Sequence, residues 1–253
     1  MKIFKLLLTI LVFSSSFLNA QDLKPEYQKF ISKFILEVKS NDKEAIANRV
    51  KFPFKREYPI PPVKDKADFI KRYNQIFDKV LIEKIVKSNP AKDWSEVGWR
   101  GIMLNQGDLW IDTDGRIISI NHQSEEELKL KNSKISEQKK NVNPSLSNFK
   151  EPVAILETSK FRIRIDDLGN DNYRYASWSL NQKMTDKPDL VIEKGTFHAD
   201  GTGENHHYEF KKGNFRYECH FIVLGEKGSA PAMLIVYQSE KEILSQDAKI
   251  VSR

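Results

Sequence analysis

Five side chains that can ligate a metal ion lie close together in the second half of the chain. Imidazole and carboxylate groups are ligands that borderline and hard divalent cations prefer. The spacing is poor, because adjacent histidines on an extended chain point to opposite faces and the intervening Gly201-Thr202-Gly203 is typical of a surface turn. We therefore weigh a weak metal site against a solvated loop, and we predict no metal ligands and no cofactor. The five residues are His198, Asp200, Glu204, His206 and His207.

A second group of residues could hold a small molecule or a glycan. Indole rings line sugar and hydrophobic sites through flat apolar faces with one polar edge, and an arginine beside them offers a partner for an anion. Core packing is the alternative for the tryptophans, because large aromatic side chains are mostly buried. The predicted ligand-binding residues are Tyr73, Trp99, Arg100 and Trp110.

Nucleophilic catalysis has little support in the sequence. There is no Gly-x-Ser-x-Gly elbow and no glycine-rich phosphate loop. The single cysteine, Cys219, falls in an alternating apolar strand and is predicted to be a buried hydrophobe. We predict no catalytic residues and expect a protein without catalytic activity. The alternative is a hydrolase or isomerase in the N-terminal half that uses an acid with His122 or Arg100, and a third hypothesis is an enzyme inhibitor.

The first twenty residues have the pattern of a signal peptide. Lys2 and Lys5 precede the apolar run Leu6 to Phe13, and a short tail ends at Ala20. We expect cleavage near Gln21, export to the periplasm or the medium of a bacterium, and no membrane span afterwards. Removal of both lysines lowers the net charge from +6 to +4. Because Lys and Arg are interspersed with Asp and Glu and no long basic block occurs, nucleic acid is not an expected partner.

The N-terminal half is predicted to contain three helices and a meander of strands. Apolar residues recur every three or four positions after Pro25, again after a polar cap at Ser40-Asn41-Asp42, and a third time from Phe69 to Leu81. After Asn89-Pro90 the period changes to two. The strands are expected at 99–104, 109–112 and 116–121, with turns at Gln106-Gly107 and Asp114-Gly115.

The C-terminal half is predicted to be composed of strands only. A charged segment from 123 to 148, which could be helical in its first part, precedes it as a linker. Short alternating runs separated by Gly and Asn are typical of a sandwich or a small barrel. The expected strands are 153–156, 161–165, 173–178, 190–192, 208–210, 215–224, 233–237 and 242–244.

The order of elements in the N-terminal half resembles the cone-shaped domains of the nuclear transport factor two superfamily. The residues that carry the resemblance are Phe52-Pro53-Phe54, the Phe69 to Phe77 stretch, and Gly101 to Leu104 followed by Gly107 to Ile111. The resemblance implies a curved sheet and helices around a pocket, which is catalytic in some members and ligand-binding or structural in others. The acid–base pairs of its enzymes have no matching positions in this sequence.

Together these patterns predict an α+β domain, with three helices packed on a curved antiparallel sheet, followed by an all-β sandwich or small barrel. The predicted parts are a signal peptide at 1–20, the α+β domain at 21–122, the charged linker at 123–148 and the all-β domain at 149–253. The expected function is that of an exported bacterial binding or structural module. Its partner would be a small molecule, a glycan or a protein.

Overall fold

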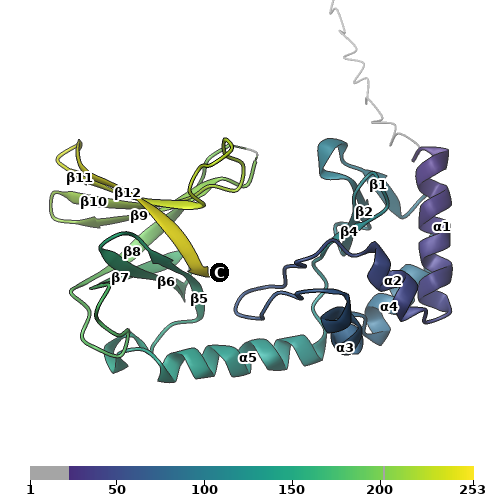
Figure 1. The fold of residues 1–253 in the computed structure, drawn as a ribbon, viewed down its shortest axis with the longest axis horizontal. Helices are drawn as coiled ribbons and strands as arrows, with labels where there is room; N and C mark the ends of the chain where they lie inside the picture. The colour runs from purple at the N-terminus through teal and green to yellow at the C-terminus, as the bar shows by residue number, and fades with distance from the viewer. Residues whose placement is uncertain (1–22, 202) are drawn as a thin grey trace, which may run out of the picture. The chain divides into compact units, whose positions relative to one another are not determined.

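The computed structural model describes residues 23–201 and 203–253 (Figure 1). The signal peptide predicted at 1–20 lies outside these residues. The described chain forms two compact units. The first unit contains residues 23–50 and 81–121, and the second contains residues 51–80 and 122–253. The second unit therefore draws on two separate stretches of sequence.

The first unit combines helices with a small antiparallel sheet. Pro25 starts the first helix, where its missing N–H costs nothing, and the carboxylate of Asp42 caps the second by accepting from the N–H of Ala45 at 3.0 Å. The helices are α1 (Pro25–Lys39), α2 (Lys43–Arg49) and α4 (Lys79–Lys87, in this unit from Leu81). The sheet runs in the order β1 (Trp94–Glu96), β2 (Ile102–Leu104), β3 (Leu109–Ile111) and β4 (Ile117–Ile120).

The second unit begins with a proline-rich segment (residues 51–65) and helix α3 (Lys66–Ile76). Helix α5 (Glu125–Lys140) and the 3-10 turn η2 (Pro144–Leu146) follow residue 121 and lead into the last eight strands, as Figure 1 shows. One face of α5 is buried despite its charge, because its Glu127 and Lys131 are paired with residues of the proline-rich segment. This helix occupies the first part of the segment predicted as a charged linker.

The eight C-terminal strands form a closed antiparallel barrel. Each strand pairs with the next along the chain, and the last pairs with the first, so the barrel is an up-and-down meander without free edges. The strands are β5 (Glu151–Glu157), β6 (Phe161–Gly169), β7 (Asn172–Ser179), β8 (Leu190–Ala199), β9 (His206–Lys212), β10 (Phe215–Phe221), β11 (Ala232–Gln238) and β12 (Lys241–Ser252).

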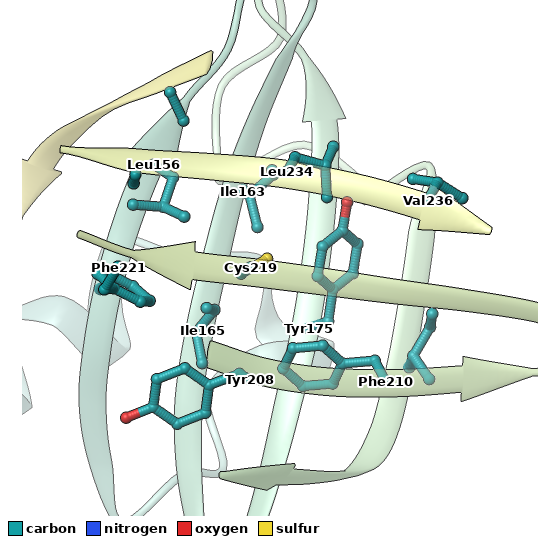
Figure 2. Close-up of a cluster of buried hydrophobic side chains, with 14 residues drawn as sticks. Leu156, Ile163, Ile165, Tyr175, Tyr208, Phe210, Cys219, Phe221, Leu234 and Val236 are labelled. Carbon is teal, nitrogen blue, oxygen red and sulfur yellow. The ribbon is translucent and has the colours of Figure 1, made fainter. Parts of the chain in front are cut away.

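Apolar side chains from all eight strands fill the barrel (Figure 2). Alternation along each strand sends one set of residues inward. In the pairing register, Tyr217, Cys219 and Phe221 of β10 lie opposite Val236, Leu234 and Ala232 of β11. Cys219 is fully buried and free, which confirms the prediction from its strand. A second apolar cluster outside the barrel packs α5 and η2 against Ala176 and Trp178 of β7.

The predicted fold class is wrong. The structure has a small helical part beside a four-stranded sheet, and α3 belongs to a different compact unit from α1 and α2. The C-terminal strands close on themselves and do not form the two packed sheets of a sandwich. A closed sheet buries its apolar face inside, which satisfies the same alternation that predicted a sandwich or a small barrel.

Two element boundaries also differ from the predictions. The single helix expected from Phe69 to Leu81 is divided at Phe77 and Asp78, because Phe77 leaves helical geometry and Asp78 pairs with His122. The strand expected from Trp99 begins only at Ile102. Residues Gly98–Arg100 instead form a 3-10 turn, and Gly101 follows it with a positive φ of 98° that favours glycine.

Among the residues that the structure describes, no helix is both long enough and apolar enough to cross a membrane.

Candidate functional site

One end of the barrel contains a cavity of about 280 Å³. The cavity lies towards the end where β5 joins β6, β7 joins β8, β9 joins β10 and β11 joins β12, because Phe161 and Leu190 begin β6 and β8 and Leu244 is near the start of β12. Barrel mouths are common ligand sites, because an eight-stranded barrel is just wide enough to leave space for one small molecule. The lining residues are Phe161, Tyr175, Ser177, Asp189, Leu190, Tyr217, Leu234, Val236, Ile243 and Leu244.

Aromatic side chains fill the opposite end of the barrel. The ring of His206 stacks on Phe221 with centroids 5.0 Å apart, and Tyr208 meets Phe221 edge-on at 5.8 Å. Tyr173 packs against Tyr208 at 4.8 Å, and the guanidinium of Arg253 lies 4.6 Å above the Phe221 ring. The barrel is therefore filled at one end and hollow at the other.

Few polar groups line the cavity. Burial, the largest cause, raises the pKa of Tyr175 far above its usual value, and its phenol is hydrogen-bonded to the Ser177 side chain. Asp189 at the rim accepts a hydrogen bond from the N–H of Ser179 at 2.9 Å, which holds the loop between β7 and β8. The site thus combines apolar walls with the hydroxyl groups of Tyr175, Ser177 and Tyr217 inside and an acid at the rim.

A larger hollow of about 630 Å³ lies outside the barrel, between the proline-rich segment, the end of α5 and strands β5, β6 and β12. Its polar side chains bond to one another. Arg164 donates to Gln138 at 2.9 Å, Gln138 donates to the hydroxyl of Tyr58 at 2.8 Å, and that hydroxyl lies 3.0 Å from Ser252. This chain of bonds joins the segments of the second unit, and we assign the hollow to packing.

The structure brings only part of the predicted ligand-binding set together. Trp99 and Arg100 share the 3-10 turn, where Trp99 is 72% exposed and the Arg100 guanidinium lies 5.6 Å from its ring. Trp110 is on β3 opposite Met103 and is half-buried. Tyr73 belongs to the other compact unit and stacks on Phe77, with ring centroids 5.0 Å apart. Binding by these four residues stays a prediction.

His122, the base considered for an enzyme, forms a pair with an acid. Its Nε2 lies 2.8 Å from Oδ1 of Asp78, and both side chains are largely buried. Next to it, Ser124 caps α5 and also donates to the carbonyl of Gln75. Neither His122 nor Asp78 lines the two hollows of the second unit described above. In this position the pair links the end of α3 to the start of α5.

The five clustered metal-ligand candidates separate as their alternation predicts. His206 points into the barrel, whereas His207 points outward and stacks on His198 of the neighbouring strand at 4.8 Å. A histidine outside the cluster joins them, because His220 of β10 stacks on His207 from the other side at 4.7 Å. The carboxylate of Asp200 lies 2.9 Å from Nδ1 of His207.

Sequence reasoning missed the barrel cavity and the place of His220. The inward residues of β10 and β11 were visible in the alternation, but the space between them depends on which strands close the barrel. The position of His220 beside His207 could have been predicted from the sequence. The two-residue turn Gly213-Asn214 fixes the register of β9 and β10, and that register places His220 opposite His207.

No protein-family model, curated protein sequence or solved structure matches this chain. The resemblance of the N-terminal half to the nuclear transport factor two superfamily therefore stays a prediction.

Proposed function

We propose that the barrel binds a small, mainly apolar molecule in the cavity at its open end. The observation that carries the proposal is the contrast between the two ends, one filled by stacked aromatic rings and the other hollow and lined by Phe161, Leu234, Val236 and Leu244. Apolar space in a protein core is costly to leave empty, since each missing contact weakens packing. A ligand of matching size recovers those contacts.

The volume sets the size of the ligand. A buried apolar cavity of roughly 150 Å³ accommodates benzene, so a cavity of about 280 Å³ suits a molecule of about ten to twelve non-hydrogen atoms. Such a molecule is smaller than most lipids. A bicyclic aromatic compound or a short branched chain fits this limit.

The polar groups set its chemistry. The hydroxyls of Tyr175, Ser177 and Tyr217 line the cavity, so they favour a ligand that carries a hydrogen-bonding group. The carboxylate of Asp189 at the rim disfavours a ligand that carries a negative charge there. We infer a neutral ligand with one hydroxyl or carbonyl group on an apolar body.

Fluorescence titration with 2-naphthol tests the proposal on the full chain, because this neutral bicyclic alcohol matches the inferred size and polarity. We expect saturable binding with one molecule per chain. Leu244→Trp fills the cavity from β12 and is expected to weaken binding at least tenfold. Ser245→Trp is the matched control, since its position is exposed and lies on the opposite face of the same strand.

The two variants separate specific binding from surface adsorption. Equal loss in both variants, or no loss in Leu244→Trp, would rule out the cavity as the binding site. Circular dichroism of each variant verifies that the barrel is folded. The pattern of residues 1–20 supports the further proposal that this binding module acts after export.

A further inference from the structure

Three histidines form a row across the outer surface of the barrel. The strand register pairs His198 of β8 with His207 of β9, and His207 with His220 of β10. Direct cross-strand neighbours have Cβ atoms about 5 Å apart, so their imidazoles meet face to face. The ring centroids lie 4.8 Å apart for the first pair and 4.7 Å for the second. We call these residues the histidine row.

An acid lies at the end of the strand beside this row. Asp200 directly follows β8, and its backbone N–H donates to the carbonyl of Asn205 at 2.8 Å, which fixes its position. Its carboxylate oxygens lie 2.9 and 3.0 Å from Nδ1 of His207, and one of them lies 3.8 Å from Nδ1 of His220. Two imidazole nitrogens and one carboxylate therefore converge on the same point.

We propose that Asp200, His207 and His220 bind a divalent transition-metal ion, with Zn²⁺ as the best match. One ligand atom from each residue lies within 4.8 Å of the other two. Around a tetrahedral ion with bonds of about 2.1 Å, ligand atoms are about 3.4 Å apart. The observed spacings lie on both sides of that value, so small side-chain rotations bring the three atoms to bonding distance.

A second carboxylate prepares His220 for this role. Nε2–H of His220 donates to Oε2 of Glu218 at 2.9 Å. This tautomer leaves a lone pair on Nδ1, the nitrogen that faces Asp200. Ligating histidines commonly donate their other nitrogen to a carboxylate, which fixes the ring and increases its basicity. Glu218 is thus a positioning residue, and it is only 9% exposed.

Metal binding changes which ring nitrogen of His207 carries the proton. Nδ1 of His207 lies within hydrogen-bonding distance of both carboxylate oxygens of Asp200. A metal ion takes the place of the proton between Nδ1 and the carboxylate, and the neutral imidazole then carries its proton on Nε2. Two histidines and one carboxylate leave a further coordination position for water, since the side chains are all partly exposed.

The surrounding charges predict that the site binds a cation with modest affinity. Glu218 is shared with Arg216, and Glu209 on the same outer face pairs with Lys211 at 2.7 Å. These bases neutralise the two glutamates and leave Asp200 as the main negative group at the ligand cluster. Nitrogen ligands exclude Mg²⁺ and Ca²⁺, which prefer oxygen, and thereby select a borderline ion.

Isothermal titration of the full chain with ZnCl₂ in a non-chelating buffer tests the site. We expect one ion per chain at micromolar Zn²⁺. His220→Gln and Asp200→Asn should each weaken binding at least tenfold. Glu218→Gln keeps the three ligands and should weaken binding by about tenfold to a hundredfold, through the loss of ring positioning. His198→Gln is the matched control, because His198 belongs to the row but not to the ligand set, and it should bind as the wild type does.

Several results would overturn the proposal. These are the absence of saturable Zn²⁺ binding to the wild type, unchanged affinity in His220→Gln and Asp200→Asn, or a loss in His198→Gln as large as theirs. Melting temperatures without metal show whether each variant is folded. Titration of the same variants with 2-naphthol keeps this test separate from the barrel cavity, whose ligand binding should be unaffected.

Discussion

The guanidinium of Arg56 and the carboxylate of Glu127 form a buried ion pair with two parallel hydrogen bonds. Nε of Arg56 donates to Oε1 of Glu127 at 2.7 Å, and Nη2 donates to Oε2 and to the carbonyl of His122. The Arg56 and Glu127 side chains are 2% and 0% exposed. The pair joins the proline-rich segment to the first turn of α5, two stretches that are distant in sequence.

Removing one partner of this pair should destabilise the second unit strongly. Glu127→Gln leaves the guanidinium buried without a matching charge, and we expect a loss of about 3 to 5 kcal/mol of unfolding free energy. The paired replacement Arg56→Met with Glu127→Leu removes both charges and should lose less stability than Glu127→Gln or Arg56→Met alone. Urea unfolding followed by circular dichroism measures all three. A double variant that is less stable than both single variants would contradict this account.

Alkaline pH should reveal the burial of Tyr73. Burial raises the pKa of Tyr73 from 10.0 to about 12. Below pH 10 the phenol is protonated in the folded and unfolded states, so it adds no pH dependence. Above pH 10 the unfolded state loses its proton first, and stability falls by about 1.4 kcal/mol per pH unit up to the folded pKa.

Tyr73→Phe removes this dependence, so the stability of the variant relative to the wild type should increase as the pH increases. Urea midpoints of both proteins at neutral pH and at about pH 11 give the comparison, and we expect the difference between them to shift towards the variant by about 1 to 2 kcal/mol. A difference that does not change with pH would mean that the phenol ionises equally in both states.

The local elements were largely readable from the sequence because they depend on short-range patterns. Helices α1 and α2 begin where Pro25 and Asp42 predicted, and each strand expected after residue 149 overlaps one of the eight barrel strands. Closure of the barrel was not readable, because the pairing of β12 with β5 joins residues such as Ile250 and Leu156, far apart in sequence. Alternation shows that a strand has a buried face and does not show which strand lies beside it.

The break between α3 and α4 illustrates the same limit. The apolar stripe continues through Phe77 to Leu81, but Val80 is 54% exposed and Asp78 pairs with His122 instead of continuing a helical face. Periodicity could not detect a tertiary partner of this kind. The candidate sites were hidden for similar reasons, since the cavity depends on barrel closure and the ligand set depends on the register that brings His220 beside His207.

Cys219 should be inert in the folded protein. Its side chain is fully buried within the barrel, where a bulky reagent has no access (Figure 2). We expect no reaction with Ellman's reagent under native conditions on the timescale of minutes, and one thiol per chain in urea. Rapid reaction of the native protein would indicate that the wall formed by β10 opens frequently.

The contact between Gly195 and Phe210 should control how well the barrel closes. A Cβ atom at position 195 would overlap the Phe210 ring and would lie 3.1 Å from the carbonyl oxygen of Tyr173 on the paired strand β7. Glycine therefore allows the fully buried ring of Phe210 to lie directly on the backbone of β8. Gly195→Ala should cost about 1 to 3 kcal/mol of unfolding free energy through overpacking.

A double-mutant cycle separates this clash from a general loss of strand stability. Phe210→Leu alone should also destabilise the barrel, because it removes part of a buried ring. When Phe210→Leu is combined with Gly195→Ala, the smaller side chain leaves room for the new methyl group, so the double variant should lose less stability than the two single losses together. Additive losses in urea unfolding would show that the glycine acts through its backbone and not through the space it leaves for Phe210.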